Sequence, residues 1–126
     1  MVLNIDQVNM NLNCMALAIY SEAHTESINA KRAVAQVILN RFRDGHFGKD
    51  ICDVVYKSGQ FQGVYDVATG KHEYPSEQDF LKTKLIALDV YFHKVNIPID
   101  NSILYFYDDS IYKHKCKYKI DSICFY

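Results

Sequence analysis

The sequence predicts a mainly helical (α+β) protein with a small strand element near its C-terminus, folded as a single domain over residues 1–126. The chain is long enough for one hydrophobic core. It is 49% hydrophobic and contains only 5 Gly and 2 Pro, which argues against disorder and low complexity. Apolar residues recur at helical spacing in three segments, and an apolar, aromatic run follows them.

The first two helices are expected on either side of a short turn. We expect the first to be capped by residues 11–13 and to end near Glu22 to His24, with apolar positions Met15, Leu17, Ala18 and Ile19. Ser27 is the expected N-cap of the second helix, and Gly45 is its expected end, after Arg41 and Arg43. The apolar stripe of this second helix is Ala30, Val34, Val37, Ile38 and Phe42.

The second half of the chain is predicted to be less regular. A short helix is expected over residues 50–56, followed by an irregular stretch over 57–75, where long loops often carry function. Ser76 and Asp79 resemble a capping box for a third long helix, which should run to about Lys94 and end before Pro98. Its expected buried face is Leu81, Leu85, Leu88, Phe92 and Val95, and a short strand is expected over 103–107.

Charge and cysteine usage exclude several classes of function. The net charge of −1 lacks the basic surplus of a nucleic-acid-binding protein. No segment is long enough for membrane insertion, and residues 1–10 carry no Lys or Arg, unlike a secretory signal. The four cysteines form no CxxC pair, so we expect no metal and no cofactor. Without a signal peptide we expect free thiols and no disulfide, for Cys14, Cys52, Cys116 and Cys124.

One carboxylate stands in a context suited to acid catalysis. Glu22 ends an apolar helix, and a turn and a second amphipathic helix follow at once. General acid catalysis at a glycosidic oxygen needs a carboxyl group that is still protonated near neutral pH. Burial, the negative end of the helix and the nearby Glu26 would each raise the pKa of Glu22. A glutamate at a helix end is more often an ordinary surface residue, so this pattern alone is weak.

A family resemblance strengthens the interpretation. The segment Glu22-Ala-His-Thr-Glu26, the following Ala33-Val-Ala and the Leu39-Asn-Arg41 triplet resemble the core motif of the SleB-type, spore cortex-lytic cell wall hydrolases. Residues 51–56 with Gly59-Gln60-Phe61 resemble the next block of that family. Residues 103–106 and 125–126 resemble its C-terminal block. The similarity runs from about residue 14 to residue 126.

The resemblance implies a lysozyme-like fold related to lytic transglycosylases, acting on peptidoglycan glycan strands. It implies that Glu22 is the catalytic acid and that Glu26 matches the second motif glutamate. With it, we expect Tyr20, Gln60, Phe61 and Tyr105 to contact substrate. We expect cleavage between N-acetylmuramic acid and N-acetylglucosamine by a monomer.

The chain departs from the family pattern at five positions. The Arg-Gly that follows the catalytic Glu-Ala is His24-Thr25 here, and loss of the glycine would alter the turn. A usual Gln is Lys31, a usual Ser or Thr is Gln62, and a usual His is Ile123. These differences bear on substrate contacts and leave the acid in place.

Two further features have a functional and a structural interpretation. The loop Gly59-Gln60-Phe61 is either a groove wall for sugars or a turn anchored by Phe61. The alternating Lys113, Lys115, Lys117 and Lys119 would share one face of a strand. That face would hold the carboxylates of peptidoglycan stems or protect a strand edge.

Three alternatives to a lytic transglycosylase remain at this level. A hydrolytic muramidase needs a second carboxylate, for which Asp53, Asp66, Glu73 and Asp108 are candidates. A cysteine-type amidase or peptidase would use Cys14 with one of the histidines His24, His46, His72, His93 or His114. The third alternative is a non-catalytic, wall-binding virion module. A short catalytic domain without a signal peptide suggests a phage product, either an endolysin held in the host cytoplasm before release or a virion-associated component.

Overall fold

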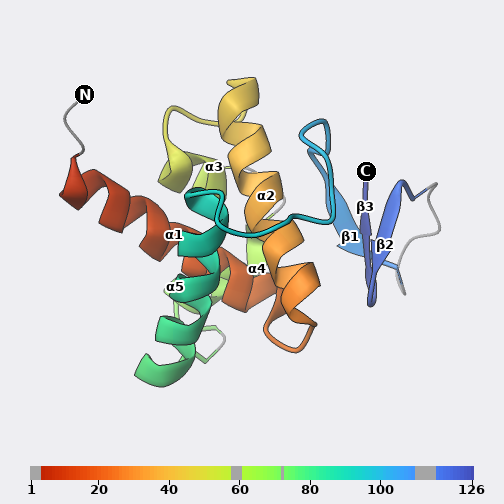
Figure 1. The fold of residues 1–126 in the computed structure, drawn as a ribbon. Helices are drawn as coiled ribbons and strands as arrows, with labels where there is room; N and C mark the ends of the chain where they lie inside the picture. The colour runs from red at the N-terminus through yellow and green to blue at the C-terminus, as the bar shows by residue number, and fades with distance from the viewer. Residues whose placement is uncertain (1–3, 58–60, 72, 110–115) are drawn as a thin grey trace.

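The computed structural model describes residues 4–57, 61–71, 73–109 and 116–126. Within these residues, five helices are followed by a small antiparallel sheet, which confirms the predicted mainly helical fold with a strand element near the C-terminus (Figure 1). The helices are α1 (Ile5–Ala23), α2 (Ile28–Asp44), α3 (Ile51–Lys57), α4 (Gln62–Ala68) and α5 (Glu77–Tyr91). The strands are β1 (Phe106–Asp108), β2 (Tyr118–Ile120) and β3 (Ile123–Phe125).

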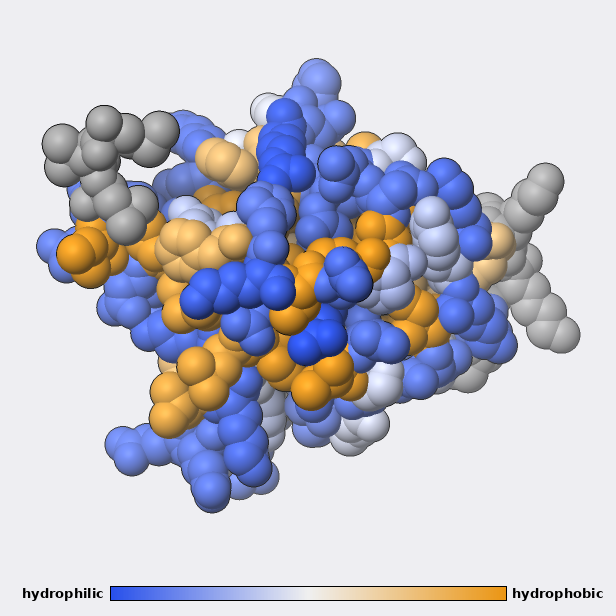
Figure 2. Space-filling model, in the orientation of Figure 1, coloured by the Kyte–Doolittle hydropathy of each residue, from blue (hydrophilic) through white to orange (hydrophobic). Residues whose placement is uncertain are grey.

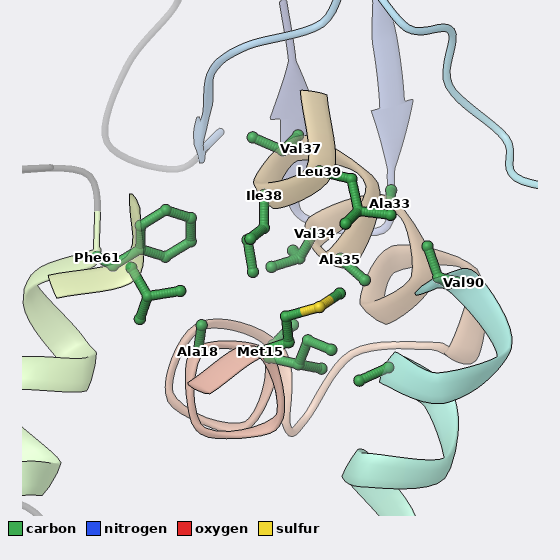
Figure 3. Packing of buried hydrophobic residues seen from close by; sticks show 14 of the residues in the cluster. Met15, Ala18, Ala33, Val34, Ala35, Val37, Ile38, Leu39, Phe61 and Val90 are labelled. Carbon is green, nitrogen blue, oxygen red and sulfur yellow. The ribbon is translucent and has the colours of Figure 1, made fainter. Parts of the chain in front are cut away.

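Helix α1 is the centre of the fold because it contacts each of the other four helices. Its buried positions include Met15, which points toward α2 in Figure 3, and Ile19. Helix α2 contributes a nearly continuous buried run from Ala33 to Arg41. The core therefore forms where α1 and α2 cross, and α3, α4 and α5 close it from the sides.

The helix boundaries follow local capping signals where those signals exist. Ser27 Oγ accepts a hydrogen bond from the N–H of Ala30 (3.2 Å), and Gly45 ends α2 with a φ of 86°. Both predictions for α2 are thus confirmed, since only glycine adopts such a φ at no steric cost. The predicted start of α1 is wrong, because Asn4 caps the helix by accepting from the N–H of Gln7 (3.0 Å).

Two predictions for the second half of the chain are wrong. Residues 62–68 form α4 within the stretch expected to be irregular, because Val64 and Val67 are buried in the core. Helix α5 begins at the expected cap, where Ser76 Oγ accepts from the N–H of Asp79 (3.1 Å). Its leucines at 81 and 85 are exposed, however, and the buried positions are Thr83, Ala87 and Val90.

The sheet has the strand order β1-β3-β2, with β3 paired antiparallel to both neighbours. Phe106 faces Phe125 across one pair, and Tyr118 faces Phe125 across the other. Residues 104–105 and Tyr126 extend this pairing through backbone hydrogen bonds. In Figure 1 the sheet lies on the side of α2 opposite to α1 and α5.

Buried polar side chains of α2 hold the segment that leads into β1. Asn40 Nδ2 donates to the carbonyl oxygens of Asp100 (3.1 Å) and Ile103 (2.9 Å), and Gln36 Nε2 donates to Asn40 Oδ1 (2.7 Å). Arg41 Nε donates to the Leu104 carbonyl (2.6 Å). Part of the family-like motif on α2 thus anchors the strand region.

The expectation of free thiols is wrong. Cys14 on α1 is bonded to Cys52 on α3, and Cys116 is bonded to Cys124 on β3. No free cysteine remains, all four positions being described. The prediction came from compartment alone, whereas the fold brings each pair to a Cα–Cα distance of 5.4 Å.

The described surface is mixed in polarity. On the face seen in Figure 2, hydrophobic residues reach the surface in patches between hydrophilic ones. Within the described residues, no helix combines the length and the hydropathy needed to cross a membrane.

Candidate active site

Glu22 lies in the last turn of α1, directly before the turn that leads into α2. The helix ends because His24 caps it: its backbone N–H and its ring Nδ1 both lie within hydrogen-bond distance of the Tyr20 carbonyl, at 3.2 and 2.8 Å. The N–H of Glu26 then donates to the Ala23 carbonyl (2.9 Å). This tight turn fixes the backbone on which Glu22 and Glu26 stand.

The carboxyl group of Glu22 is largely removed from water. Its pKa is raised from 4.5 to about 7, mainly by burial and to a smaller extent by the charge of Asp66 on α4. The backbone of Gly63 interacts with the carboxylate and acts in the opposite direction. Oε1 is buried, and no described residue hydrogen-bonds to it. Glu22 therefore retains a proton near neutral pH, as a general acid must.

Gly63 allows α4 to approach this carboxyl group closely. A Cβ at position 63 would lie 3.1 Å from Glu22 Oε1 and 3.3 Å from Ser21 Cβ. Any larger side chain would have to displace one of them. The glycine is thus part of the site, and no local sequence signal marks it, because α4 lies in the stretch that the sequence predicts to be irregular.

A cavity of about 280 Å³ lies between Glu22 and the sheet. Its wall combines the α1–α2 turn with β1 and the β2–β3 turn, and its lining residues are Glu22, Glu26, Phe106, Tyr107, Asp108, Ser122 and Ile123. Ser122 Oγ donates to Glu26 Oε1, and the N–H of Ser27 donates to Asp121 Oδ2 (2.7 Å). These two bonds hold the β2–β3 turn against the turn that carries Glu22.

A second cavity, of about 400 Å³, opens between α1 and α4. It is lined by Tyr20, Ser21, His24, Gly63, Val67 and Glu73. Tyr20 and His24 stack with ring centroids 4.7 Å apart and an interplanar angle of 19°. Gly63 lines this cavity and also lies against Glu22, which itself lines the first cavity, so the two cavities are neighbours.

The structure gathers only some of the expected substrate-contacting residues around Glu22. Tyr20 and Glu26 line the two cavities, and Gln60 lies outside the described residues. Phe61 is only 2% exposed and packs edge-on against Phe106, which fits the structural interpretation, a loop anchor. Tyr105 lines neither cavity and stacks on Tyr126.

The candidate second carboxylates separate into two groups. Asp66 acts on the pKa of Glu22, Asp108 shares its cavity, and Glu73 lines the neighbouring cavity. Asp53 belongs to α3, where it accepts from the N–H of Lys49 and lies 3.5 Å from the Lys57 ammonium. Asp66, and not Glu26, is the carboxylate whose charge raises the pKa of Glu22.

The basic run near the C-terminus is engaged in ion pairs where it is described. Lys117 Nζ lies 2.8 Å from Asp100 Oδ2, and Lys119 Nζ lies 2.7 Å from Asp109 Oδ2. Both lysines are next to or on β2, which pairs on one side only. This arrangement favours protection of a strand edge; Lys113 and Lys115 lie outside the described residues.

The cysteine-based alternative lacks a nucleophile, because Cys14 is bonded to Cys52. The described residues also contain no group of three or more His, Cys, Asp or Glu side chains placed to hold a metal ion.

Comparison with known proteins agrees with this geometry. Residues 25–126 match the family model described as Cell Wall Hydrolase, a match that begins three positions after Glu22. The chain is also similar in structure to the catalytic domain of the germination-specific lytic transglycosylase SleB from Bacillus anthracis. The two are 25% identical with a TM-score of 0.73, and the similarity covers 98% of each chain, including the position of Glu22. No curated protein matches the sequence.

Proposed function

Because this chain belongs to the cell wall hydrolase family, we propose that it cleaves the glycan strands of peptidoglycan between N-acetylmuramic acid and N-acetylglucosamine. The proposed reaction is that of a lytic transglycosylase with Glu22 as its acid. The observation that carries the proposal is the largely buried carboxyl group with its pKa raised to about 7, on the wall of a cavity that it shares with β1 and the β2–β3 turn. The similarity to the SleB catalytic domain supports the same reaction type.

The reaction needs one group that first gives and then takes a proton. Protonated Glu22 donates to the glycosidic oxygen, and the bond from that oxygen to C1 of the muramic residue breaks, leaving its electron pair on the oxygen. The Glu22 carboxylate then accepts the proton of the C6 hydroxyl of the same residue. The C6 oxygen bonds to C1 and gives a 1,6-anhydro sugar. The hydroxyl is tethered to the reacting ring, so its effective concentration is high.

A pKa near 7 suits both halves of this cycle. A carboxyl group with an ordinary pKa would be almost fully ionised at neutral pH and would seldom hold the proton. Glu22 is instead close to half protonated, which favours donation and subsequent uptake in turn. We expect kcat/KM to fall as the pH rises above about 7, since the protonated fraction of Glu22 is then lost.

Hydrolysis is the second candidate, and one observation favours it. Asp66 is close enough to influence Glu22, and Asp108 lines the same cavity, so a second carboxylate is available near the acid. A hydrolase would use such a group to activate water or to attack C1. The products distinguish the two reactions, because only hydrolysis incorporates an oxygen atom from water.

The central experiment digests purified glycan strands in heavy-oxygen water and identifies the products by mass spectrometry. We expect unlabelled 1,6-anhydro-muramic acid ends. Labelled reducing ends would establish hydrolysis instead and would direct substitution to Asp66 and Asp108.

The role of Glu22 is tested with Glu22→Gln, which keeps the shape of the side chain and removes the acidic proton of the carboxyl group. We expect at least a hundredfold loss of cleavage, the size of effect typical for general acid catalysis. Glu77→Gln is the matched control, because Glu77 lies in the first turn of α5 and outside both cavities. Cleavage by Glu22→Gln within a few-fold of the unchanged protein would refute the role assigned to Glu22.

A further inference from the structure

The cavity between α1 and α4 has features that the acid alone does not explain. It is the larger of the two cavities beside Glu22, at about 400 Å³, and lies within the size range of sites for small ligands. One wall is the stacked pair Tyr20–His24, and Glu73 lies on the lining as well.

The hydrogen bonding of His24 fixes what its ring can offer. Nδ1 lies 2.8 Å from the Tyr20 carbonyl oxygen, which can only accept, so Nδ1 carries the hydrogen. In the neutral ring Nε2 is then an acceptor. The same carbonyl also takes the backbone N–H of His24, so ring and backbone are held together at the helix end. Tyr20 and His24 therefore form one rigid aromatic surface.

The polar groups around this surface are mainly acceptors. The Glu73 carboxylate accepts, neutral His24 Nε2 accepts, and the tyrosine hydroxyl can do both. No Lys or Arg belongs to the cavity lining among the described residues, and the charge of Asp66 reaches the neighbouring Glu22. Such a lining favours a ligand with hydroxyl or amide donors and an apolar face, and it disfavours a carboxylate.

We propose that Tyr20 and His24 form a binding platform for an uncharged N-acetylated sugar of the glycan strand, and that Glu73 excludes carboxylate-bearing groups from it. The proposal rests on the proposed function, and it names the residues that hold one side of the substrate. Tyr20 and His24 are binding residues here, and Glu22 alone performs the proton transfer. The stem-peptide carboxylates of peptidoglycan would then lie outside this cavity.

The test measures binding separately from cleavage. In a Glu22→Gln background, the dissociation constant of a hexamer of N-acetylglucosamine is measured by calorimetry. Tyr20→Ala and His24→Ala should each weaken binding roughly tenfold, as expected for removal of one main contact. Tyr20→Phe keeps the ring and should restore most of the affinity. Phe42→Ala is the matched control, since Phe42 lines a different cavity between α2, α1 and α5 and should leave binding unchanged.

The charge selection is tested with a second probe. An oligomer of galacturonic acid carries a carboxylate on each ring and should bind at least tenfold more weakly than the N-acetylglucosamine hexamer. Glu73→Gln should reduce this difference in affinity between the two oligomers, because it removes the negative charge that repels the carboxylates. Equal affinity of the Glu22→Gln protein for both oligomers would refute the proposed exclusion of carboxylates.

Unchanged affinity in Tyr20→Ala and His24→Ala, an equal loss in Phe42→Ala, or no binding of the hexamer would each overturn the platform. These outcomes are separate from failure of the proposed function. If the unchanged protein does not cut glycan strands while the Tyr20 and His24 variants still lose affinity, the platform stands and the catalytic proposal falls. If cleavage occurs and the affinities do not change, the reverse holds.

Discussion

Glu22 and Arg41 are two largely buried ionisable side chains whose surroundings differ. Glu22, at the end of α1, has a carboxylate oxygen that no described residue hydrogen-bonds to, and burial raises its pKa to about 7. Arg41, near the end of α2, is only 2% exposed, and burial lowers its pKa to about 10. Its Nε donates to the Leu104 carbonyl, and its guanidinium carbon lies 4.5 to 5.5 Å from the ring centroids of Phe47, Phe61 and Tyr105.

This difference shows how burial affects an ionisable group that has many polar and aromatic partners and one that has few. A pKa of about 10 leaves Arg41 charged at neutral pH, since a carbonyl and three aromatic faces replace water around it. Glu22 is compensated less, because only the Gly63 backbone offsets the effect of burial and Oε1 has no hydrogen-bond partner among the described residues, so its pKa lies near neutral pH. Arg41 thus stays charged inside the fold, whereas Glu22 can change its protonation state near pH 7. Four sets of substitutions probe this contrast.

The largest expected effect is on stability at Arg41. Arg41→Ala removes a charge-assisted hydrogen bond and the contacts with three rings, and it leaves the Leu104 carbonyl without this donor. We expect a loss of about 4 kcal/mol in the free energy of unfolding. Arg41→Met retains most of the packing and should lose about half as much. Chemical denaturation measures both, and equal losses would show that packing plays no part.

Glu22→Gln should have the opposite sign and a defined pH dependence. The folded-state pKa of Glu22 lies above the ordinary value of 4.5 that it has in the unfolded chain, so folding favours its protonated form. The stability that follows is complete below pH 4.5 and is lost as the pH rises through about 7. Glu22→Gln should therefore match the unchanged protein at pH 4 and exceed it by up to about 3 kcal/mol at pH 8. Thermal denaturation at the two pH values measures the difference.

The wall of the Glu22 cavity can be loosened without touching Arg41. Cys116→Ser with Cys124→Ser opens a bridge that spans 8 residues and should cost about 2.5 kcal/mol. Cleavage should fall at temperatures where the protein is still folded, because Ser122 and Ile123 line the cavity. The control is Cys14→Ser with Cys52→Ser, which spans 38 residues and leaves the hairpin in place. An equal loss of cleavage in the two double variants would contradict a specific role for the β2–β3 hairpin.

The smallest effect is on the pH profile. Asp66→Asn removes the charge that raises the pKa of Glu22, so the decline of kcat/KM on the alkaline side should move to lower pH. Glu26→Gln should leave the alkaline decline of kcat/KM at the same pH, and should lower activity only because it weakens the bond to Ser122. A shift with Glu26→Gln and none with Asp66→Asn would reverse this assignment.

The sequence predicted those parts of the fold that depend on short-range chemistry. Ser27, Gly45 and Ser76 act through bonds to residues three or four positions away, or through their own φ, so they are readable locally. The buried face of α5 was not readable in this way. Thr83, Ala87 and Val90 are small and allow α5 to pack closely on α1 and α2, and the larger Leu81 and Leu85 remain outside. Hydrophobicity alone favoured the leucines.

The candidate site likewise contains one residue that the local sequence identifies and others that only the tertiary structure connects to it. Glu22 could be named from its motif, because the motif lies within one turn and two helix ends. Asp66 and Gly63 could not be connected to it, since α4 is defined by Val64 and Val67 packing into the core and by no cap or strong period. The disulfide pairings were equally hidden, because each depends on where α1, α3 and the strands meet.

The strand order β1-β3-β2 has a consequence for how the protein is made. Strands β1 and β2 both pair with β3, which leaves the ribosome after either of them. The helices, by contrast, are complete in the chain before β1 appears. The nascent chain thus exposes Glu22 while the wall formed by Ser122 and Ile123 is still missing. Translation itself delays completion of the cavity until the last strand of the sheet has emerged.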